Sequence, residues 1–332
     1  MVYAPVYIYW MWLALRSRSF FFFSTSNPTI RNAGFLLESK KEIYDLIPDQ
    51  YYPATLFFKR GEKMAVVLNN IRAHGMKFPL VGKPDIGMQG LAVKKLANAN
   101  DLVHYVTASK VNFLLQEYIP YENEVGIFYY RFPNEQNGHI SGIVRKEFLS
   151  VTGDGISTIE TLLKKEKRFI LQLNTLHVSN GPELKLVLNA GEKRVLVPYG
   201  NHVRGAKFLD ISHLANEALV KVIDDACKKI NGFYFGRMDV RYNDWEELCL
   251  GKNFSIIELN GAGSEPTHIY DPKNSIFFAW KEIIRHLNIL ARISRINHKQ
   301  QCLSYMKLSD GLQMIRDNSR YVKLLNEVKR AI

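Results

Sequence analysis

The chain has 332 residues, of which 47% are hydrophobic, and a formal net charge of +12. This content is enough for a large core, so the composition excludes a disordered chain and favours two or three lobes. The positive charge suits polyanionic ligands such as nucleotide phosphates, nucleic acid or an acidic membrane surface. Three cysteines without close spacing favour neither a disulfide framework nor a zinc site, so the expected compartment is the reducing cytoplasm.

The N-terminal segment 1–37 begins with apolar and aromatic residues. The run before Arg16 is about 15 residues long, shorter than the ~20 that a membrane-spanning helix needs. Its arginines follow the apolar residues, which is the reverse of a secretory signal. We expect the segment to pack against the rest of the protein or against a second copy in a homodimer. Contact with a membrane surface through its aromatic residues and arginines is the alternative.

The C-terminal segment 273–332 is predicted to be helical and basic. From Lys281 to the end there are eleven Lys and Arg residues against four Asp and Glu residues. A solvated helical face explains such a surplus, and no nucleic-acid partner is expected because no RNA-binding motif or DNA-reading helix is recognisable. Peripheral attachment to an anionic membrane is the alternative for this end of the chain.

In chain order, hydrophobic periodicity first predicts alternating helices and strands. A helix is expected over 37–47, with Ser39 as its cap and Pro48 at its end. The elements that follow are a strand at 55–60, a helix at 63–76, a strand at 78–84, a strand and a helix within 91–106, and an apolar strand at 112–119.

The second half of the chain begins with two alternating runs, 123–132 and 139–151, which predict antiparallel strands. After a lysine-rich stretch, the pattern predicts a strand at 191–200 and an amphipathic helix at 211–230. A hairpin of strands at 232–242 and 254–260 comes next, and helices fill the rest. Hairpins mixed with helices indicate an α+β protein.

Both strands of that last hairpin carry side chains with oxygen donors. Two-residue alternation places four residues of the first strand on one face: Phe235, Arg237, Asp239 and Arg241. It likewise places Ile256, Glu258 and Asn260 together on the second strand. If the strands pair, Asp239, Glu258 and Asn260 meet. Three such oxygen donors suit Mg²⁺, because water molecules and substrate phosphates complete its coordination shell. Capped or solvent-facing strand ends are the alternative.

A glycine-containing loop follows the strand at 78–84. Lys83 lies at the strand's end and can supply a point charge to phosphate oxygens, while Gly87 and Gly90 let backbone amides approach a ligand. The loop from Asp85 to Gly90 matches neither a Walker loop nor GxGxxG. An ordinary turn is the alternative.

The segment LLQEYIPYENEVGIF joins an apolar strand to an acidic stretch. Its Glu117, Tyr118 and Ile119 form a hinge that can offer main-chain groups to a purine. Glu124, seven residues after Glu117, can accept both ribose hydroxyls. Solvated acids are the alternative.

The order and the intervals of these three elements resemble the ATP-grasp superfamily over about 38–272. The resemblance implies an ATP-grasp fold with a small lobe at 38–118 and a large lobe at 119–272, which bears the metal site. It implies a set of nucleotide-binding residues: Lys40, Lys83, Gly87, Gly90, Glu117, Tyr118, Ile119 and Glu124. By the same resemblance Asp239, Glu258 and Asn260 are the ligands of Mg²⁺, with Mn²⁺ as the alternative ion.

A narrower resemblance connects residues 153–159, Asn201, Gly205 and Asp210 with the ATP-grasp parts of cyanophycin synthetase and bifunctional glutathione synthetases. The chain is also similar to D-alanine:D-alanine ligase. These resemblances imply that ATP drives the joining of a carboxylate to an amine through an acyl phosphate, with small molecules or peptides as substrates. A non-catalytic nucleotide-binding module is the alternative.

Three basic residues are the expected catalytic groups. Arg204 and Arg237 are candidates for the transferring phosphoryl group and the developing oxyanion, because a guanidinium fork matches both. A structural ion pair is the alternative for each arginine. Lys146, rather than its neighbour Arg145, is expected near the nucleotide by the family resemblance. Ser264, Glu265 and His268 follow the metal-bearing strand and are candidates for contact with substrate.

A departure from the family pattern concerns the N-terminus. ATP-grasp ligases usually carry a full α/β domain before the small lobe, and only 37 residues stand there in this chain. The choice of substrate is therefore open.

Overall fold

The computed structural model describes residues 3–88, 90–197, 200 and 202–332. The chain divides into two compact units, one formed by residues up to Val144 together with Asp210–Ile332, and the other by Arg145–Leu209. A four-stranded sheet, a five-stranded sheet and a two-stranded sheet are present, with helices between their strands. This mixture confirms the predicted α+β class, whereas the four-segment division of the chain stays a prediction.

The four-stranded sheet of the first unit is antiparallel and has the strand order β1-β4-β2-β3. Its elements are β1 (Thr55–Phe58), β2 (Leu80–Pro84), β3 (Lys94–Leu96), β4 (Phe113–Glu117), α2 (Lys40–Tyr44), α3 (Met64–Ala73) and α4 (Ala99–Ala108). Each matches a predicted strand or helix. Helix α2 is shorter than predicted, but its cap is confirmed because Ser39 Oγ accepts a hydrogen bond from the Glu42 amide.

The five-stranded sheet has the order β11-β10-β5-β6-β9. Its strands are β5 (Asn123–Tyr130), β6 (His139–Glu147), β9 (Lys207–Asp210), β10 (Phe235–Tyr242) and β11 (Phe254–Asn260). Strand β10 is antiparallel to both of its neighbours, which confirms the predicted hairpin with β11. A short helix, α9 (Trp245–Cys249), lies in the hairpin connection.

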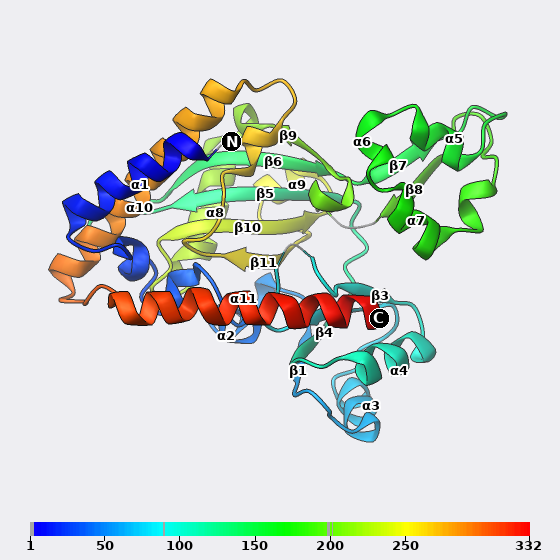
Figure 1. The fold of residues 1–332 in the computed structure, drawn as a ribbon, viewed down its shortest axis with the longest axis horizontal. Helices are drawn as coiled ribbons and strands as arrows, with labels where there is room; N and C mark the ends of the chain where they lie inside the picture. Colours follow the sequence, from blue (N-terminus) through cyan, green and yellow to red (C-terminus); the bar gives the residue numbers. More distant parts are fainter. Residues whose placement is uncertain (1–2, 89, 198–199, 201) are drawn as a thin grey trace. The chain divides into compact units, whose positions relative to one another are not determined.

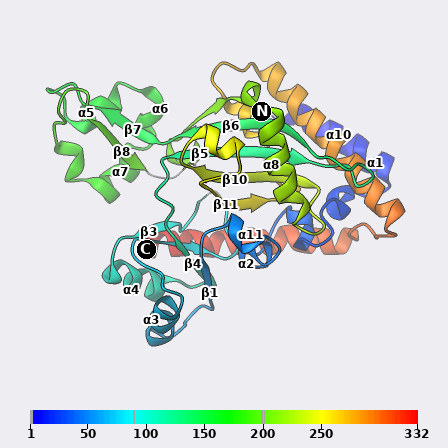
Figure 2. The same ribbon diagram turned by 180° about the vertical axis from the view of Figure 1, so that it is seen from behind.

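The two faces of β10 differ as its alternation predicts. Met238, Val240 and Tyr242 are buried in a core that includes Leu219 and Ile223 of α8 (Glu217–Lys228). The opposite face of the sheet is covered by α1 (Ala4–Ser17) and α10 (Ile276–Gln300), so the helices sandwich the sheet, and Figures 1 and 2 show α8 and the α1–α10 pair on opposite sides.

One extra residue in β11 changes the predicted orientation of its side chains. Asp239 lies opposite Glu258, but Val240 lies opposite Ile256, so Ile257 is a β-bulge. The bulge brings Ile256 into the buried core beside Val240. The prediction that Ile256 shares a face with Glu258 is therefore wrong.

The N-terminal segment packs on the first unit, as predicted. Leu13 and Ala14 of α1 are buried in one core with Leu290 of α10, and the 3₁₀ turn η1 (Phe22–Thr25) adds Phe22 and Phe23. Figure 1 shows α1 lying along α10. No helix in the described part of the chain combines the length and the apolar character needed to cross a bilayer.

The last helix, α11 (Leu308–Ala331), supports the segment that follows the predicted phosphate loop. Leu325 and Val328 form a small core with Ala92 and Val111. Figure 1 shows the helix reaching from the end near α10 toward β3. Near the loop, burial raises the pKa of Tyr321 to about 12.

The second unit contains β7 (Leu149–Thr152) paired with β8 (Lys193–Val197), and its helices are α5 (Ile159–Lys164), α6 (Lys167–Ile170) and α7 (Leu173–Asn180). The run 139–151 was predicted as one strand, but it forms β6 and β7 in different sheets because β7 pairs with β8. The remaining 3₁₀ turns are η2 (Arg31–Gly34), η3 (Asp49–Tyr51), η4 (Glu183–Lys185), η5 (His202–Arg204), η6 (Ser212–Leu214) and η7 (Thr267–Tyr270).

Candidate functional site

Lys83 lies at the end of β2 and reaches across to β11. Its ammonium group donates to the Tyr44 hydroxyl at 2.7 Å, to Gln116 Oε1 at 2.7 Å and to the Ile257 carbonyl at 3.3 Å. The carbonyl belongs to the bulged residue of β11, so the bulge presents a main-chain acceptor to the lysine. A predicted phosphate-binding lysine is therefore joined to the strand that bears the predicted metal ligands.

The environment of Lys83 opposes its charge. Burial and the nearby positive charge of Lys40 lower the pKa of Lys83 to about 7, although Glu258 acts in the other direction. At neutral pH the side chain is therefore divided between its neutral and its charged form.

Lys40, the first residue of α2, approaches the same strand from another direction. Its side chain, 13% exposed, forms an ion pair with Glu258 of β11. Burial opposes the charge of both groups, but their mutual attraction prevails, so the pKa of Lys40 is raised and the pKa of Glu258 is lowered. The two lysines thus converge on consecutive residues of β11, Ile257 and Glu258.

Tyr44 completes this contact and was not predicted as a site residue. It lies four residues after Lys40 on α2, and its hydroxyl donates to the Ile257 carbonyl while accepting from Lys83. The i, i+4 spacing from Lys40 was the available sequence signal.

Asp239 and Glu258 face each other across the β10–β11 ladder, and Asn260 lies opposite Arg237. Asp239 is buried and accepts two bonds from Arg237, at 3.0 Å from Nε to Oδ1 and at 3.3 Å from Nη2 to Oδ2. The structure therefore brings the three predicted metal ligands together at neighbouring ladder positions. Arg237 and Lys40 supply the positive charge that two facing carboxylates require.

The donor set fits a hard cation. The Nδ2 atom of Asn260 is buried and has no hydrogen-bond partner among the described residues, and the two ends of an amide are exchangeable by a flip that would present the oxygen. Two carboxylates and one amide oxygen match the preference of Mg²⁺. No three His, Cys, Asp or Glu side chains cluster as a metal site within the described ranges. The metal assignment stays a prediction.

Glu124, the predicted ribose acid, is buried beside Arg241, its ladder partner on β10. Nε of Arg241 lies 3.4 Å from Glu124 Oε2, and Nη1 donates to the carbonyls of Ile119 and Tyr121 at 3.3 and 3.2 Å. The arginine therefore ties the acid to the predicted adenine hinge. Sequence reasoning placed Arg241 on the correct face but gave it no role, because pairing with Glu124 depends on the strand register.

Some main-chain groups of the hinge already form hydrogen bonds within the protein. The amide of Glu117 donates to the Ala54 carbonyl at 2.9 Å, and the carbonyl of Ile119 accepts from Arg241. The ring of Tyr118 lies 4.0 Å, centroid to Nζ, from the ammonium of Lys95. The predicted adenine contacts of the hinge stay predictions.

The predicted phosphate loop begins at an anchored residue. Asp85 is buried and accepts hydrogen bonds from Ser39 Oγ at 2.8 Å and from the Lys41 amide at 2.9 Å, which ties the loop to the start of α2. A Cβ atom on Gly87 would lie 3.2 Å from Cε of Lys40, so the missing side chain lets the loop pass close to that lysine. Gly90 has a left-handed backbone, with φ of 67°.

Lys146 and Arg204 belong to the second unit. Lys146 is buried, with Nζ 5.9 Å from the centre of the Phe208 ring, whereas Arg145 is exposed. Arg204 is half-buried at the end of η5, and Asn201 lies outside the described residues. The predicted catalytic roles of Lys146 and Arg204 stay predictions.

The residues after β11 divide into two groups. Glu265 is exposed and accepts from the hydroxyls of Tyr3 and Tyr270, and Ser264 donates to the Gly261 carbonyl. His268 is buried and paired with Glu282 at 3.2 Å. The imidazole of His268 is thus held inside the protein, while Ser264 and Glu265 remain candidates for contact with substrate.

No family model matches the sequence, and no curated protein was found to match it. Solved structures do match. The VanG D-Ala:D-Ser ligase from Enterococcus faecalis aligns with 76% of this chain at 15% identity and a TM-score of 0.43. A D-alanine–D-alanine ligase from Bacillus anthracis aligns with 79% at 13% identity and a TM-score of 0.46.

A third match is a bifunctional glutathione synthetase from Pasteurella multocida, which covers 80% of this chain at 12% identity and a TM-score of 0.42. The chain spans 61% of the VanG ligase, 69% of the D-alanine–D-alanine ligase and 38% of the glutathione synthetase.

Proposed function

We propose that this protein is an ATP-grasp ligase that uses ATP to join a carboxylate to an amine. The observation that carries the proposal is the convergence of Lys40 and Lys83 on β11, beside the facing carboxylates Asp239 and Glu258. Phosphoryl transfer depends mainly on positioning and charge neutralisation, and this arrangement offers both.

ATP would lie between the two sheets of the first unit. Lys40 and Lys83 would bind the α- and β-phosphates, under the loop that contains Gly87 and Gly90. The carbonyl of Glu117 and the amide of Ile119 would read the adenine. The ribose hydroxyls would bind the carboxylate of Glu124.

Asp239, Glu258 and Asn260 would hold Mg²⁺ or Mn²⁺. The ion, when bound, would neutralise charge on the phosphates. Lys40, now paired with Glu258, would be free to turn toward the nucleotide, since an ammonium and a metal ion compete for the same carboxylate oxygens.

The reaction would proceed in two steps. A substrate carboxylate oxygen attacks the γ-phosphorus of ATP, and the bond from this phosphorus to the β-phosphate oxygen breaks. ADP departs, and the substrate is now an acyl phosphate. The amine nitrogen then attacks the acyl carbon, the bond to the phosphate oxygen breaks, and the nitrogen loses a proton. Arg237 would stabilise the transferring phosphoryl group.

Phosphate release from ATP tests this function. The assay combines Mg²⁺ with pooled amino acids, dipeptides and hydroxy acids, and compares the wild type with Asp239→Asn. Release that requires both a carboxylate and an amine, and that falls at least a thousandfold in the variant, is expected. The matched control is Asp225→Asn, an exposed acid on α8 paired with Lys221. ATP binding without release from any pool would indicate the alternative, a nucleotide-binding module.

A further inference from the structure

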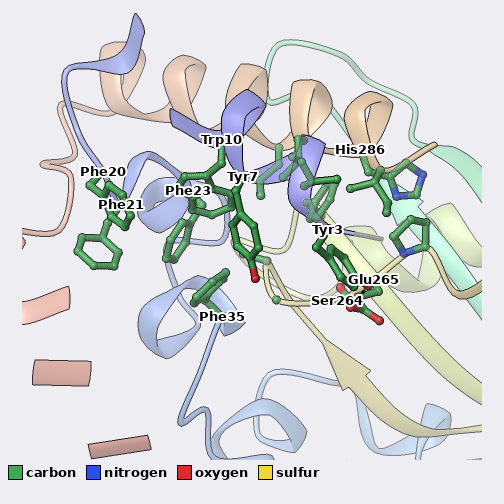
Figure 3. Close-up of a pocket in the computed structure, with 18 of the residues that line it drawn as sticks. Tyr3, Tyr7, Trp10, Phe20, Phe21, Phe23, Phe35, Ser264, Glu265 and His286 are labelled. Atoms are coloured by element: carbon green, nitrogen blue, oxygen red, sulfur yellow. Dashed lines mark hydrogen bonds between the residues drawn. The ribbon is translucent and has the colours of Figure 1, made fainter. Parts of the chain in front are cut away.

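An apolar cavity of about 350 Å³ lies between α1, α10 and the loop that follows β11 (Figure 3). Aromatic side chains dominate its wall, among them Trp10, Phe23, Phe35 and Phe235. The ring centres of Phe23 and Phe35 are stacked at 4.1 Å. A volume of this size is typical of small-molecule sites, and such a lining favours an apolar group.

Two residues with polar side chains, Ser264 and Glu265, lie at one end of the cavity, whose surface is otherwise almost wholly apolar. Figure 3 shows Phe20 at one end and Glu265 beside Ser264 at the other, with Trp10 and Tyr7 between them. The ligand that this arrangement suits is therefore elongated, with an apolar body and a polar head.

The floor of the cavity is fixed by close backbone packing. The amides of Ala262 and Gly263 donate to the carbonyls of Ala33 and Gly34 at 2.9 Å each. A Cβ atom on Gly34 would lie 2.6 Å from the Cα atom of Gly261, so only glycine allows this approach. The strand that bears Asn260 thus continues directly into the cavity wall.

Glu265 provides the charge at the polar end. Its carboxylate is held by the hydroxyls of Tyr3 and Tyr270, and burial together with the contact to Glu265 raises the pKa of Tyr3. Ser264, the residue before Glu265, lies with Oγ 3.3 Å from the carbonyl oxygen of Asn260, one of the proposed metal ligands. The polar end therefore adjoins the proposed reaction centre.

The rest of the wall is uncharged. His286 lines the cavity on α10, and burial, with the positive charge of Arg285, lowers its pKa to about 3, so the imidazole is neutral at physiological pH. The carboxylate of Glu265 is thus the charged group among the residues that line the cavity.

We infer that this cavity binds the amine substrate, and that this substrate is a primary amine with an elongated apolar or aromatic body. The inference rests on the proposed function and names its acceptor. The apolar body would occupy the space between α1 and α10, and the amino group would lie at Glu265, near Asn260. A carboxylate head would be repelled there, whereas an ammonium head is attracted.

Calorimetric titration without ATP tests the inference with defined probes. The probes are 2-phenylethylamine, 4-phenylbutylamine and 5-phenylpentanoate, the last of which replaces the amino group with a carboxylate. We expect 4-phenylbutylamine to bind about 15-fold more tightly than 2-phenylethylamine, because each buried methylene adds about fourfold. We also expect it to bind at least tenfold more tightly than 5-phenylpentanoate.

Two variants separate the two ends of the cavity. Glu265→Gln should remove the preference for the amine over the carboxylate and keep the dependence on chain length. Leu287→Trp, at a half-buried lining position, should fill the cavity and weaken 4-phenylbutylamine at least tenfold. Glu166→Gln, at an exposed position of the second unit, is the matched control and should change neither preference.

Equal binding of amine and carboxylate, or no dependence on chain length, would overturn the inference. An unchanged preference in Glu265→Gln would overturn it as well. Because ATP is absent from the titration, its results are independent of the proposed ligase activity. Amine binding without phosphate release from ATP would contradict the proposed function but not this inference. Phosphate release without amine binding to the cavity would contradict this inference but not the proposed function.

Discussion

One face of strand β10 changes from apolar to charged between two successive residues on that face, Phe235 and Arg237. Phe235 packs with α1 and α10 against the apolar cavity, whereas Arg237 and Asp239, the next residues on that face, belong to a charged cluster. The charged part is held by ion pairs and hydrogen bonds between separate elements, and the apolar part by ring packing and close backbone contact. A single strand therefore borders both the proposed nucleotide site and the cavity proposed for an apolar group.

The difference matters for stability. A buried charge needs its partner, so loss of one member of a pair leaves the other unsatisfied. A buried apolar group depends on the volume it fills, so its loss leaves a cavity. The two regions should respond differently to truncation.

Glu124→Gln tests the charged region and should have the largest effect on folding. The variant removes the carboxylate charge that faces the buried Arg241, which costs about 4 kcal/mol in the free energy of unfolding. Urea denaturation measures the change. Glu122→Gln, an exposed acid two residues away, is the control and should change little. A loss below about 1 kcal/mol in Glu124→Gln would contradict the pairing.

Leu13→Ala tests the apolar region. Leu13 is 1% exposed between α1 and α10, so its truncation should cost about 3 kcal/mol. Leu15→Ala is an equal change two residues along the same helix, at a side chain that is 75% exposed. It should cost less than about 0.5 kcal/mol. Equal losses in the two variants would mean that α1 does not pack as described.

The smallest and most specific predicted effect is a pH dependence of stability that comes from the protonation of Lys83. Because burial lowers its pKa to about 7, the unfolded chain binds more protons than the folded chain above that value. The contribution of Lys83 to stability therefore grows as the pH rises from 7 toward ~10.4, the ordinary lysine pKa.

Nucleotide binding should reverse this shift, since phosphates favour the charged lysine. At pH 8, titration of ATP and Mg²⁺ in buffers of different ionisation enthalpy should show uptake of about one proton per ATP. At pH 6 the uptake should nearly vanish, because Lys83 is already charged. A pH-independent uptake, or the same uptake in Lys83→Met, would exclude this lysine as the proton acceptor.

Much of the fold could be predicted from the sequence. The alternation on β10 and the cap at Ser39 gave correct elements and faces, because both depend on local spacing. The bulge at Ile257 and the break between β6 and β7 were missed, since both depend on the partner strand.

The candidate site divides in the same way. The positions of Lys83, Asp239 and Glu258 followed from motif order, and the structure brings them to one place. The bond from Tyr44 to the Ile257 carbonyl, and the link from Arg241 to the hinge, required the strand register. The cavity required tertiary packing, because its wall joins the N-terminal helix to residues more than 200 positions later.

The binding of Mg²⁺-ATP, measured by calorimetry for the wild type and Lys83→Met, most directly tests the claim that Lys83 and the facing carboxylates form a nucleotide site. The wild type should bind with a Kd in the range of about 1 μM to 1 mM that is usual for enzyme substrates. Lys83→Met should bind about 30-fold more weakly, since it loses charge-assisted hydrogen bonds to phosphate. Lys59→Met, at an exposed lysine, should bind like the wild type. Absence of binding at Mg²⁺-ATP concentrations several times the upper end of this range, or equal binding by the wild type and Lys83→Met, would contradict the claim.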